Sequence, residues 1–247
     1  MAEKNSCYAG KLLRIDLTAG SVSTEDFGSD YTDLFIGGRG VASKVLYDEV
    51  PPEIAPFDPD NRLIFSPGAL HGTGAPSASR TTVTTRSPLT GMHGDGHAGA
   101  TWGGELKRAG YDLLIIQGKS DKPVYLFMDN DRVELRDAGK LWGSFTSKTH
   151  ANLCREIGDH EICTVSIGPA GENKVRLAAV FHNGADKGTS ARCGLGAVMG
   201  AKNLKAIATR GTGDVGVADI PALKSAYQDY IDTIAVDPYC PPATKYG

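Results

Sequence analysis

The sequence lacks the features of a membrane or secreted protein. It has no apolar run of about 18 residues, which a transmembrane helix needs, and its first residues, MAEKNSCYAGK, contain no apolar signal segment. A large excess of positive charge is also absent, because the formal net charge is -3. We therefore expect a cytoplasmic protein with neither a membrane nor a nucleic-acid partner.

Cysteine pairs are also missing. The five cysteines are odd in number and scattered, and no two of them form a C-x-x-C motif. This pattern indicates free thiols in a reducing compartment and argues against a zinc or iron–sulfur site made by this chain alone. The cysteines are Cys7, Cys154, Cys163, Cys193 and Cys240.

Nucleotide-binding and nucleophile motifs are absent as well. Neither G-x-x-x-x-G-K-[ST] nor G-x-G-x-x-G after a parallel strand occurs. No Ser/His/Asp grouping stands out as a catalytic constellation. We therefore expect no nucleotide site and assign no catalytic residue.

Glycine, in contrast, is abundant, with 31 residues. Many of these glycines fall in two stretches, GMHGDGHAGATWGG (91–104) and NGADKGTSARCGLG (183–196), and each stretch precedes a short helical segment and a β-like run. Small residues expose backbone N–H groups, while Lys, Arg and a helix N-terminus near Gly196 add positive charge. The pattern predicts two phosphate-binding loops, and hence a ligand with two phosphate-like groups or two copies of one ligand.

The two loops belong to a longer repeat. A β-hairpin, a strand with a Pro/Gly turn, a second strand, a glycine-rich loop, a short helix and a strand follow one another twice. This order predicts an internal duplication, with pseudo-repeats at about 10–119 and 120–212. The expected fold is α+β: two similar, mainly antiparallel β-rich subdomains. The matching segments are 11–26 and 123–137, 62–72 and 161–172, 80–87 and 175–182, and 111–119 and 203–211.

Helices are expected outside the repeat at 40–50, 147–158 and 219–235, the last with Asp219 as its N-cap and Pro221 in its first turn. The Pro-rich tail YCPPATKYG is interpreted as a linker. The predicted domains are 1–212, which holds the two predicted phosphate-binding loops, and 213–247, a helix and linker leading to later domains.

Several polar residues near the loops have alternative interpretations. Arg80 and Arg39 are candidate cations for an anion. His93 and His97, around Asp95, are weighed as a metal site against ordinary loop residues. Cys193 is either an activated thiol or a small residue in a crowded loop. Glu105 and Glu172 are helix caps, loop anchors or ligand contacts.

Seven segments carry a family resemblance: GKLLRIDLTAGSV, GGRG, SPGALHGTGAPSASR, SPLTG, GGELKRAGYD, SIGPAGENKV and ARCGLGAVMGAKNLKAIA. Together they resemble the N-terminal domain of the tungsten-containing aldehyde:ferredoxin oxidoreductases. The resemblance implies a base of two subdomains beneath a tungsten (or molybdenum) ion held by two pyranopterins, with magnesium bridging the pterin phosphates.

By position, the resemblance implies a set of cofactor-binding residues. The backbone carbonyl of His97 is expected at the magnesium, where the best-known members have an asparagine. The loop at 187–189 aligns only loosely with the family, so its expected role in phosphate binding rests on its own hydrogen-bond donors. The full set is Arg80, His97, Gly99, Lys187, Gly188, Thr189, Ala191 and Arg192.

The implied reaction is oxidation of an aldehyde to a carboxylate with ferredoxin as electron acceptor. The resemblance also implies that later domains, absent here, supply the 4Fe–4S cluster and the acid/base residues. This chain alone is therefore expected to be incomplete and inactive without those domains or a partner subunit. Alternatives are a benzoyl-CoA-reductase-type catalytic subunit, a non-catalytic pterin-binding module and a ligand-free scaffold.

Overall fold

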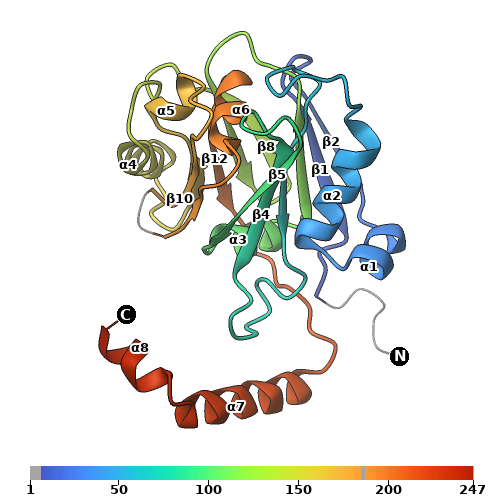
Figure 1. Cartoon of the computed structure of the whole chain (residues 1–247), viewed down its shortest axis with the longest axis vertical. Coiled ribbons are helices and arrows are strands. Elements are labelled where there is room, and N and C mark those ends of the chain that lie inside the picture. The colour runs from blue at the N-terminus through green and yellow to red at the C-terminus, as the bar shows by residue number, and fades with distance from the viewer. Residues whose placement is uncertain (1–6, 185–186, 247) are drawn as a thin grey trace.

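A computed structural model of the protein describes residues 7–184 and 187–246. Within these ranges the chain forms two six-stranded sheets with flanking helices and a helical arm (Figure 1). The first sheet has the order β2-β1-β6-β3-β4-β5. Its strands are β1 (Lys11–Asp16), β2 (Ser21–Asp26), β3 (Leu63–Pro67), β4 (Arg80–Arg86), β5 (His93–Gly99) and β6 (Leu113–Gln117).

The second sheet has the order β11-β10-β9-β12-β7-β8, which is the order of the first sheet read from the other edge with each strand number raised by six. In both sheets one pair is parallel, β1 with β6 and β7 with β12, and the other pairs are antiparallel. The predicted α+β class is confirmed. The strands are β7 (Val124–Asp129), β8 (Arg132–Asp137), β9 (Cys163–Ser166), β10 (Val180–His182), β11 (Thr189–Ser190) and β12 (Leu204–Arg210).

Helices cover the outer face of each sheet, and the inner faces share one core. On the first sheet α2 packs Val41 and Val45 against Ile64 and Ile115, and on the second sheet α4 contributes Leu153 to a similar layer. The helices are α1 (Ser29–Phe35), α2 (Gly38–Glu49), α3 (Trp102–Arg108), α4 (Thr146–Ile157), α5 (Pro169–Glu172), α6 (Leu195–Ala201), α7 (Ile220–Val236) and α8 (Cys240–Tyr246).

The central core joins the two halves, because side chains of both sheets and of α3 and α6 form one buried cluster. Trp102 of α3 is fully buried there and donates a hydrogen bond from Nε1 to Thr209 Oγ1 at 3.1 Å. Lys202, at the end of α6, reaches into the first half and donates to the carbonyls of Pro59 and Gly118 at 2.9 and 3.0 Å. Burial lowers the pKa of Lys202 to about 7.

Most elements that the sequence predicted are present, including both hairpins and the helices near 40–50, 147–158 and 219–235. Asp219 caps α7 as predicted, since its Oδ1 accepts from the backbone N of Ala222 at 2.8 Å. Two predictions are wrong. The first glycine-rich stretch is largely strand β5, and most of the expected linker is helix α8, because Pro241 and Pro242 lie in its first turn, where a missing N–H costs nothing. Helix α1 was not predicted, and the strand expected at 175–182 begins only at Val180.

The arm formed by α7 and α8 extends away from the two sheets (Figure 1). No side chain of α7 is buried. Its Tyr230 Oη lies 2.7 Å from Ser77 Oγ, which ties the helix to the loop before β4. Within the described ranges, no helix is long and apolar enough to span a bilayer.

Candidate functional site

β5 is an edge strand whose two faces differ in character. Side chains alternate between the faces of a strand, and here the inner positions Gly94 and Gly96 are buried while the outer positions carry Asp95 and His97. Glycine is depleted in strands, which is why the sequence indicated a loop. The strand nevertheless needs these glycines, because another backbone lies against its inner face.

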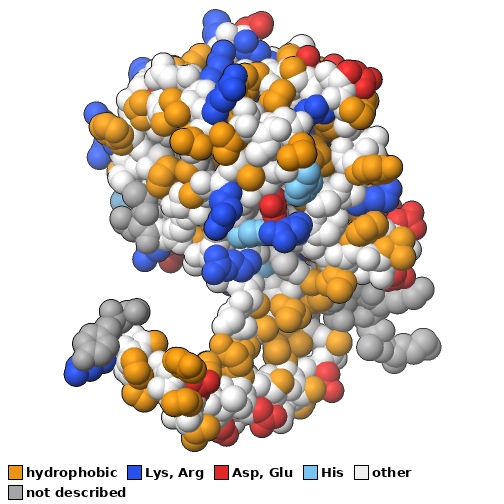
Figure 2. All heavy atoms as spheres, in the orientation of Figure 1, with side chains coloured by type: hydrophobic (Ala, Val, Ile, Leu, Met, Phe, Trp, Pro, Cys, Tyr) orange, Lys and Arg blue, Asp and Glu red, His pale blue; other side chains and the backbone are white. Residues whose placement is uncertain are grey.

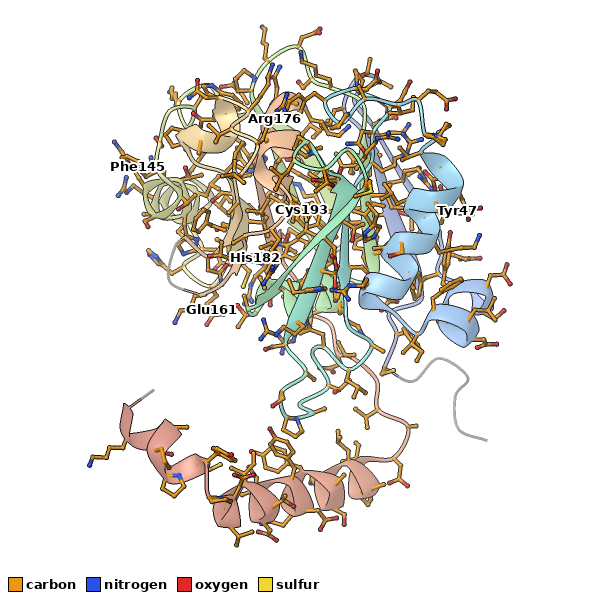
Figure 3. All side chains as sticks on the ribbon, in the orientation of Figure 1. Tyr47, Phe145, Glu161, Arg176, His182 and Cys193 are labelled. Carbon is orange, nitrogen blue, oxygen red and sulfur yellow. The ribbon has the colours of Figure 1, made fainter. Side chains whose placement is uncertain are left out.

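That second backbone is the other glycine-rich segment. A Cβ atom at Gly96 would lie 3.3 Å from the carbonyl carbon of Ser190, and a Cβ at Gly188 would lie 3.1 Å from the carbonyl oxygen of Gly99. Figure 3 shows Cys193, further along this segment, near the centre of the molecule beside β5. The two stretches predicted as loops thus lie side by side, and we call their contact the glycine seam.

On the outer face of β5, polar side chains meet the first turn of α2. Arg39 Nε donates to Asp95 Oδ2 at 2.5 Å, and Arg39 Nη2 lies 2.6 Å from His97 Nε2. His97 Nδ1 lies 2.9 Å from Thr82 Oγ1. His97 Nε2 also lies 3.0 Å from Asp95 Oδ2, so Arg39, Asp95 and His97 form one polar cluster on this face.

Three other cations lie along the seam, Arg80 and Lys187 near its Gly99 end and Arg192 nearer to Gly94. The side chains of Arg80, Lys187 and Arg192 are exposed, and within the described part of the chain none of them makes a hydrogen bond or ion pair. The space-filling view shows blue Lys and Arg atoms gathered around histidine and one acidic side chain on this face (Figure 2). Cations without carboxylate partners leave this surface with uncompensated positive charge.

The remaining predicted residues lie along the same segments. Gly99 pairs directly with Arg80 across β5 and β4. Gly188 has φ +149° and packs on Gly99, so its glycine is required by the backbone itself. Thr189 is half-buried in β11, and Ala191 is exposed. The structure therefore brings all of the predicted binding residues to the seam and its rim.

The geometry does not support a metal site formed by the side chains of His93 and His97. His93 contacts Ser43, with Nε2 at 3.0 Å from Oγ, whereas His97 is engaged by Arg39 and Thr82. Among the described residues, no group of three or more His, Cys, Asp or Glu side chains could hold a metal ion. A backbone role for His97 remains a prediction.

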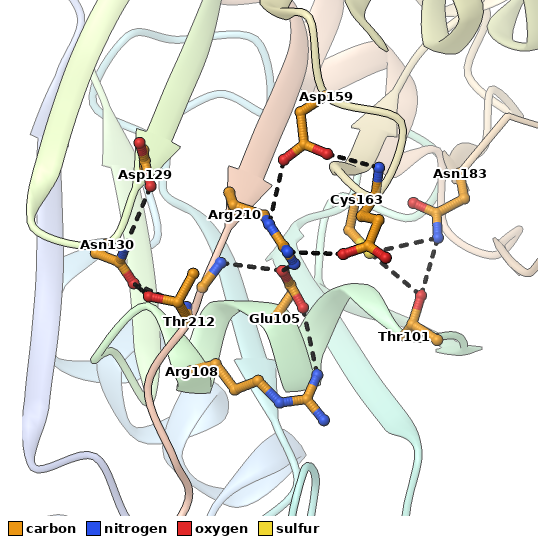
Figure 4. Close-up of polar contacts among 12 residues, drawn as sticks. Thr101, Glu105, Arg108, Asp129, Asn130, Asp159, Cys163, Asn183, Arg210 and Thr212 are labelled. Atoms are coloured by element: carbon orange, nitrogen blue, oxygen red, sulfur yellow. Dashed lines mark hydrogen bonds and ion pairs between the residues drawn. The ribbon is translucent and has the colours of Figure 1, made fainter.

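Glu105 is a loop anchor, one of the roles considered for it. Its carboxylate accepts from Arg210 Nη1 at 2.9 Å and from the backbone N of Gly211 at 3.0 Å (Figure 4). These contacts form one wall of a polar cavity of about 500 Å³ that also contains Cys163, whose sulfur lies 3.3 Å from Thr101 Oγ1. Burial raises the pKa of Cys163, so this thiol is held protonated.

Glu172 has the equivalent role in the second half. Its Oε1 receives a charge-assisted bond from Lys205, and its Oε2 accepts from the backbone N of Gly143 at 2.9 Å. Lys205 is fully buried and also donates to the carbonyls of Ser144 and Ile167. Glu172 therefore fixes the turn before α4 and is not available to a ligand.

Sequence reasoning missed an apolar hollow between α2 and the β4–β5 turn. It has a volume of about 390 Å³, and Leu46, Tyr47, Val50 and Met92 line it. Tyr47 and Met92 are exposed at its rim, with exposed fractions of 87% and 68%. The sequence predicted a helix at 40–50 but gave no signal for an exposed apolar surface on it.

Together these features define an α+β protein with two sheets of equal topology and a cationic face at the seam between them. The sequence model described as "Aldehyde ferredoxin oxidoreductase, N-terminal domain" matches residues 12–211. The chain therefore belongs to the aldehyde ferredoxin oxidoreductase family of oxidoreductases, as its N-terminal domain, and the resemblance is confirmed.

Relatives in this family are longer than the chain. It is 46% identical over 231 residues to the tungsten-containing aldehyde ferredoxin oxidoreductase of Pyrococcus abyssi. The match covers 94% of this chain and 38% of that relative. It is 37% identical to the aliphatic sulfonate oxidoreductase, WOR-like subunit, of Pyrococcus furiosus, covering 83% of the chain and 35% of that relative.

A solved structure shares the fold closely. The active site complex BamBC of benzoyl coenzyme A reductase, in complex with 1,5-dienoyl-CoA, matches with a TM-score of 0.90 and 40% identity. The match covers 93% of this chain and 35% of that chain. The chain thus spans less than two fifths of the length of these relatives.

Proposed function

We propose that this chain is the N-terminal cofactor-binding part of a tungsten (or molybdenum) bis-pyranopterin oxidoreductase. The observation that carries the proposal is a set of three cations along the glycine seam, Arg80, Lys187 and Arg192, that make no hydrogen bond or ion pair with the described residues. A phosphate dianion is the natural partner for guanidinium and ammonium groups that the fold leaves without carboxylates. Tungsten is proposed as the metal because the relative from Pyrococcus abyssi is named as a tungsten-containing enzyme.

The residues fit such a group. A side chain at Gly99 would occupy the space beside the guanidinium of Arg80, since its Cβ would lie 3.6 Å from Arg80 Cζ. A bare backbone next to a free guanidinium suits close approach of a phosphate. Lys187, Thr189 and Arg192 add donors from the second half, and the carbonyl of His97 is proposed as a magnesium contact.

When bound, the metal–pterin group supplies the redox chemistry. This chain's part is to hold and orient the phosphates through its cations and the backbone of the seam. Oxidation of aldehydes to carboxylates, ferredoxin as acceptor and a 4Fe–4S cluster held by later domains complete the proposal for the whole enzyme. The protein is proposed to work in the cytoplasm with those later domains or a partner subunit.

The two halves are proposed to descend from an internal duplication and to form a common base for the cofactor, one half for each pterin. The identical strand order of the two sheets, including the position of the parallel pair, supports this. The helices also recur, with α3 before β6 and α6 before β12.

A benzoyl-CoA-reductase-type catalytic subunit is the second candidate. The chain is 40% identical to such a complex, with a TM-score of 0.90, and this identity is close to the 46% that it shares with the aldehyde ferredoxin oxidoreductase of Pyrococcus abyssi. Both candidates use the same cofactor surface in this chain. Assays of the protein that contains this chain, with an aldehyde and with an aromatic acyl-CoA, separate them.

Tungsten, molybdenum and pterin content per mole of purified protein tests the shared proposal. We expect metal and pterin in a fixed ratio, measured by elemental analysis and pterin fluorescence. A well-folded protein that carries neither, after production with tungstate and with molybdate, would contradict it. Pterin bound without redox activity would favour a non-catalytic binding module.

A further inference from the structure

Arg39 differs from the other cations of this surface because it is held in place. Its Nε donates to Asp95 Oδ2 at 2.5 Å, and its Nη2 lies 2.6 Å from His97 Nε2. The side chain is nevertheless 61% exposed. Its Nη1 group contacts no partner among the described residues, so these N–H donors remain open to a ligand.

The residues that hold Arg39 are themselves fixed. Asp95 is only 19% exposed and projects from the outer face of β5. His97 Nδ1 lies 2.9 Å from Thr82 Oγ1 on the neighbouring strand β4, and its Nε2 lies 3.0 Å from Asp95 Oδ2. An arginine whose guanidinium is oriented in advance loses less side-chain entropy when it binds an anion.

The contact with His97 places the guanidinium of Arg39 on the strand face that also carries Arg80. Thr82 pairs with His97, and Arg80 pairs with Gly99, two residues further along the same two strands. Two residues of a strand span about 6.6 Å, and both pairs lie on the same face because side chains alternate. A single pyrophosphate-sized anion is long enough to meet both guanidinium groups.

We propose that Arg39 is a further anion-binding residue of this surface, and that Asp95 and His97 are positioning residues that aim its guanidinium at the anion. The inference rests on the proposed function, because the anion is the phosphate end of the same cofactor. Arg39 also neutralises Asp95, whose carboxylate would otherwise repel a phosphate at this face.

Inorganic pyrophosphate is the probe, and isothermal titration calorimetry of the purified chain at low ionic strength is the measurement. We expect Arg39→Ala to weaken binding about tenfold, as the loss of one charge-assisted contact does. The matched control is Arg132→Ala on β8: Arg132 is also 61% exposed and also bonds a carboxylate, Glu134, at 2.5 Å. We expect it to leave the affinity unchanged.

Asp95→Asn separates positioning from charge. Removing a negative charge next to an anion site should tighten binding if only charge matters. If Asp95 aims Arg39, we expect binding to weaken about threefold, with an unchanged melting temperature by circular dichroism. Tighter binding by Asp95→Asn would overturn the positioning role.

The outcomes also distinguish this inference from the proposed function. Weaker binding by Arg80→Ala together with unchanged binding by Arg39→Ala would overturn the inference and leave the cofactor proposal standing. No pyrophosphate binding by the wild-type chain, or unchanged binding in both variants, would overturn both. Equal losses in Arg39→Ala and Arg132→Ala would show a general charge effect and would likewise reject the role of Arg39.

Discussion

Arg80 and Gly99 face each other across β4 and β5, and the guanidinium of Arg80 lies beside the position of a side chain at Gly99, with Cζ 3.6 Å from a Cβ atom placed there. The pair combines a full positive charge with a stretch of strand that has no side chain. An anion at this place meets the charge and the bare backbone together. The contact is therefore the part of the surface most open to direct tests.

Arg80→Ala and Arg192→Ala should each weaken retention of the pterin, because each leaves phosphate charge uncompensated. The loss of one charge-assisted contact corresponds to about 1.5 kcal/mol, or roughly tenfold in affinity. Pterin fluorescence and tungsten content per mole of protein measure it. Arg155→Ala, an exposed arginine on α4, is the control, and unchanged cofactor content in both test variants would reject the phosphate-binding role.

Gly99→Val should lower cofactor content without unfolding the protein. Its φ is not in the left-handed region, and a new Cβ would make only ordinary contacts with Arg80. Gly96→Val is the contrasting variant, since its Cβ would lie 2.9 Å from Leu195 Cδ1 in the glycine seam. Such overpacking should cost about 2 kcal/mol of stability.

Thermal melting and pterin content are measured together for these two glycine variants. We expect a normal melting temperature with little pterin for Gly99→Val, and a lowered melting temperature for Gly96→Val. Full pterin occupancy in Gly99→Val would show that the cofactor does not approach this backbone.

Lys202 should make stability increase with pH above neutrality. Burial lowers its pKa in the folded protein to about 7, whereas the unfolded value is about 10.4. Between these values the unfolded chain binds one more proton, so the free energy of unfolding gains up to about 1.4 kcal/mol per pH unit from this group.

Urea unfolding at a series of pH values between about 7 and 10 measures this slope. We expect Lys202→Met to have a flatter slope than wild type, together with lower stability, because the bonds to Pro59 and Gly118 are lost. Lys140→Met, at an exposed position, should leave the slope unchanged. Equal slopes in wild type and Lys202→Met would mean that the lysine stays charged when folded.

The α7 arm should bind a hydrophobic dye. Ile231 and Val236 on this helix have exposed fractions of 39% and 82%, and no residue of the helix is buried. Replacing both with Gln should reduce dye fluorescence several-fold without changing the melting temperature of the two-sheet body. Fluorescence equal to that of the wild-type chain would place the exposed apolar surface elsewhere.

Local signals in the sequence predicted the elements whose causes are local. The hairpins have turn residues between alternating strands, and Asp219 followed by Pro221 marks the start of α7. The order of the elements along the chain also predicted which strands of the first sheet correspond to which strands of the second. These features depend on neighbouring residues, so the sequence displays them directly.

The features that the sequence did not predict arise from tertiary contacts. The glycines of β5 looked like a loop because the backbone that packs on them, at 188–195, lies far along the chain. Arg39 and Asp95 are 56 residues apart and meet only after α2 packs on β4 and β5. The two prolines of α8 suggested a linker, because proline is compatible with a helix only in its first turn. Where this helix begins could not be predicted from the local sequence.

The glycine seam also limits which substitutions the domain can accept. A Cβ atom at Gly96 would lie 2.9 Å from Leu195 Cδ1, and one at Gly188 would lie 3.1 Å from the carbonyl oxygen of Gly99. Even alanine at either position would therefore force these neighbouring atoms apart. Because β5 belongs to the first sheet and β11 to the second, any such displacement would move the two sheets relative to each other.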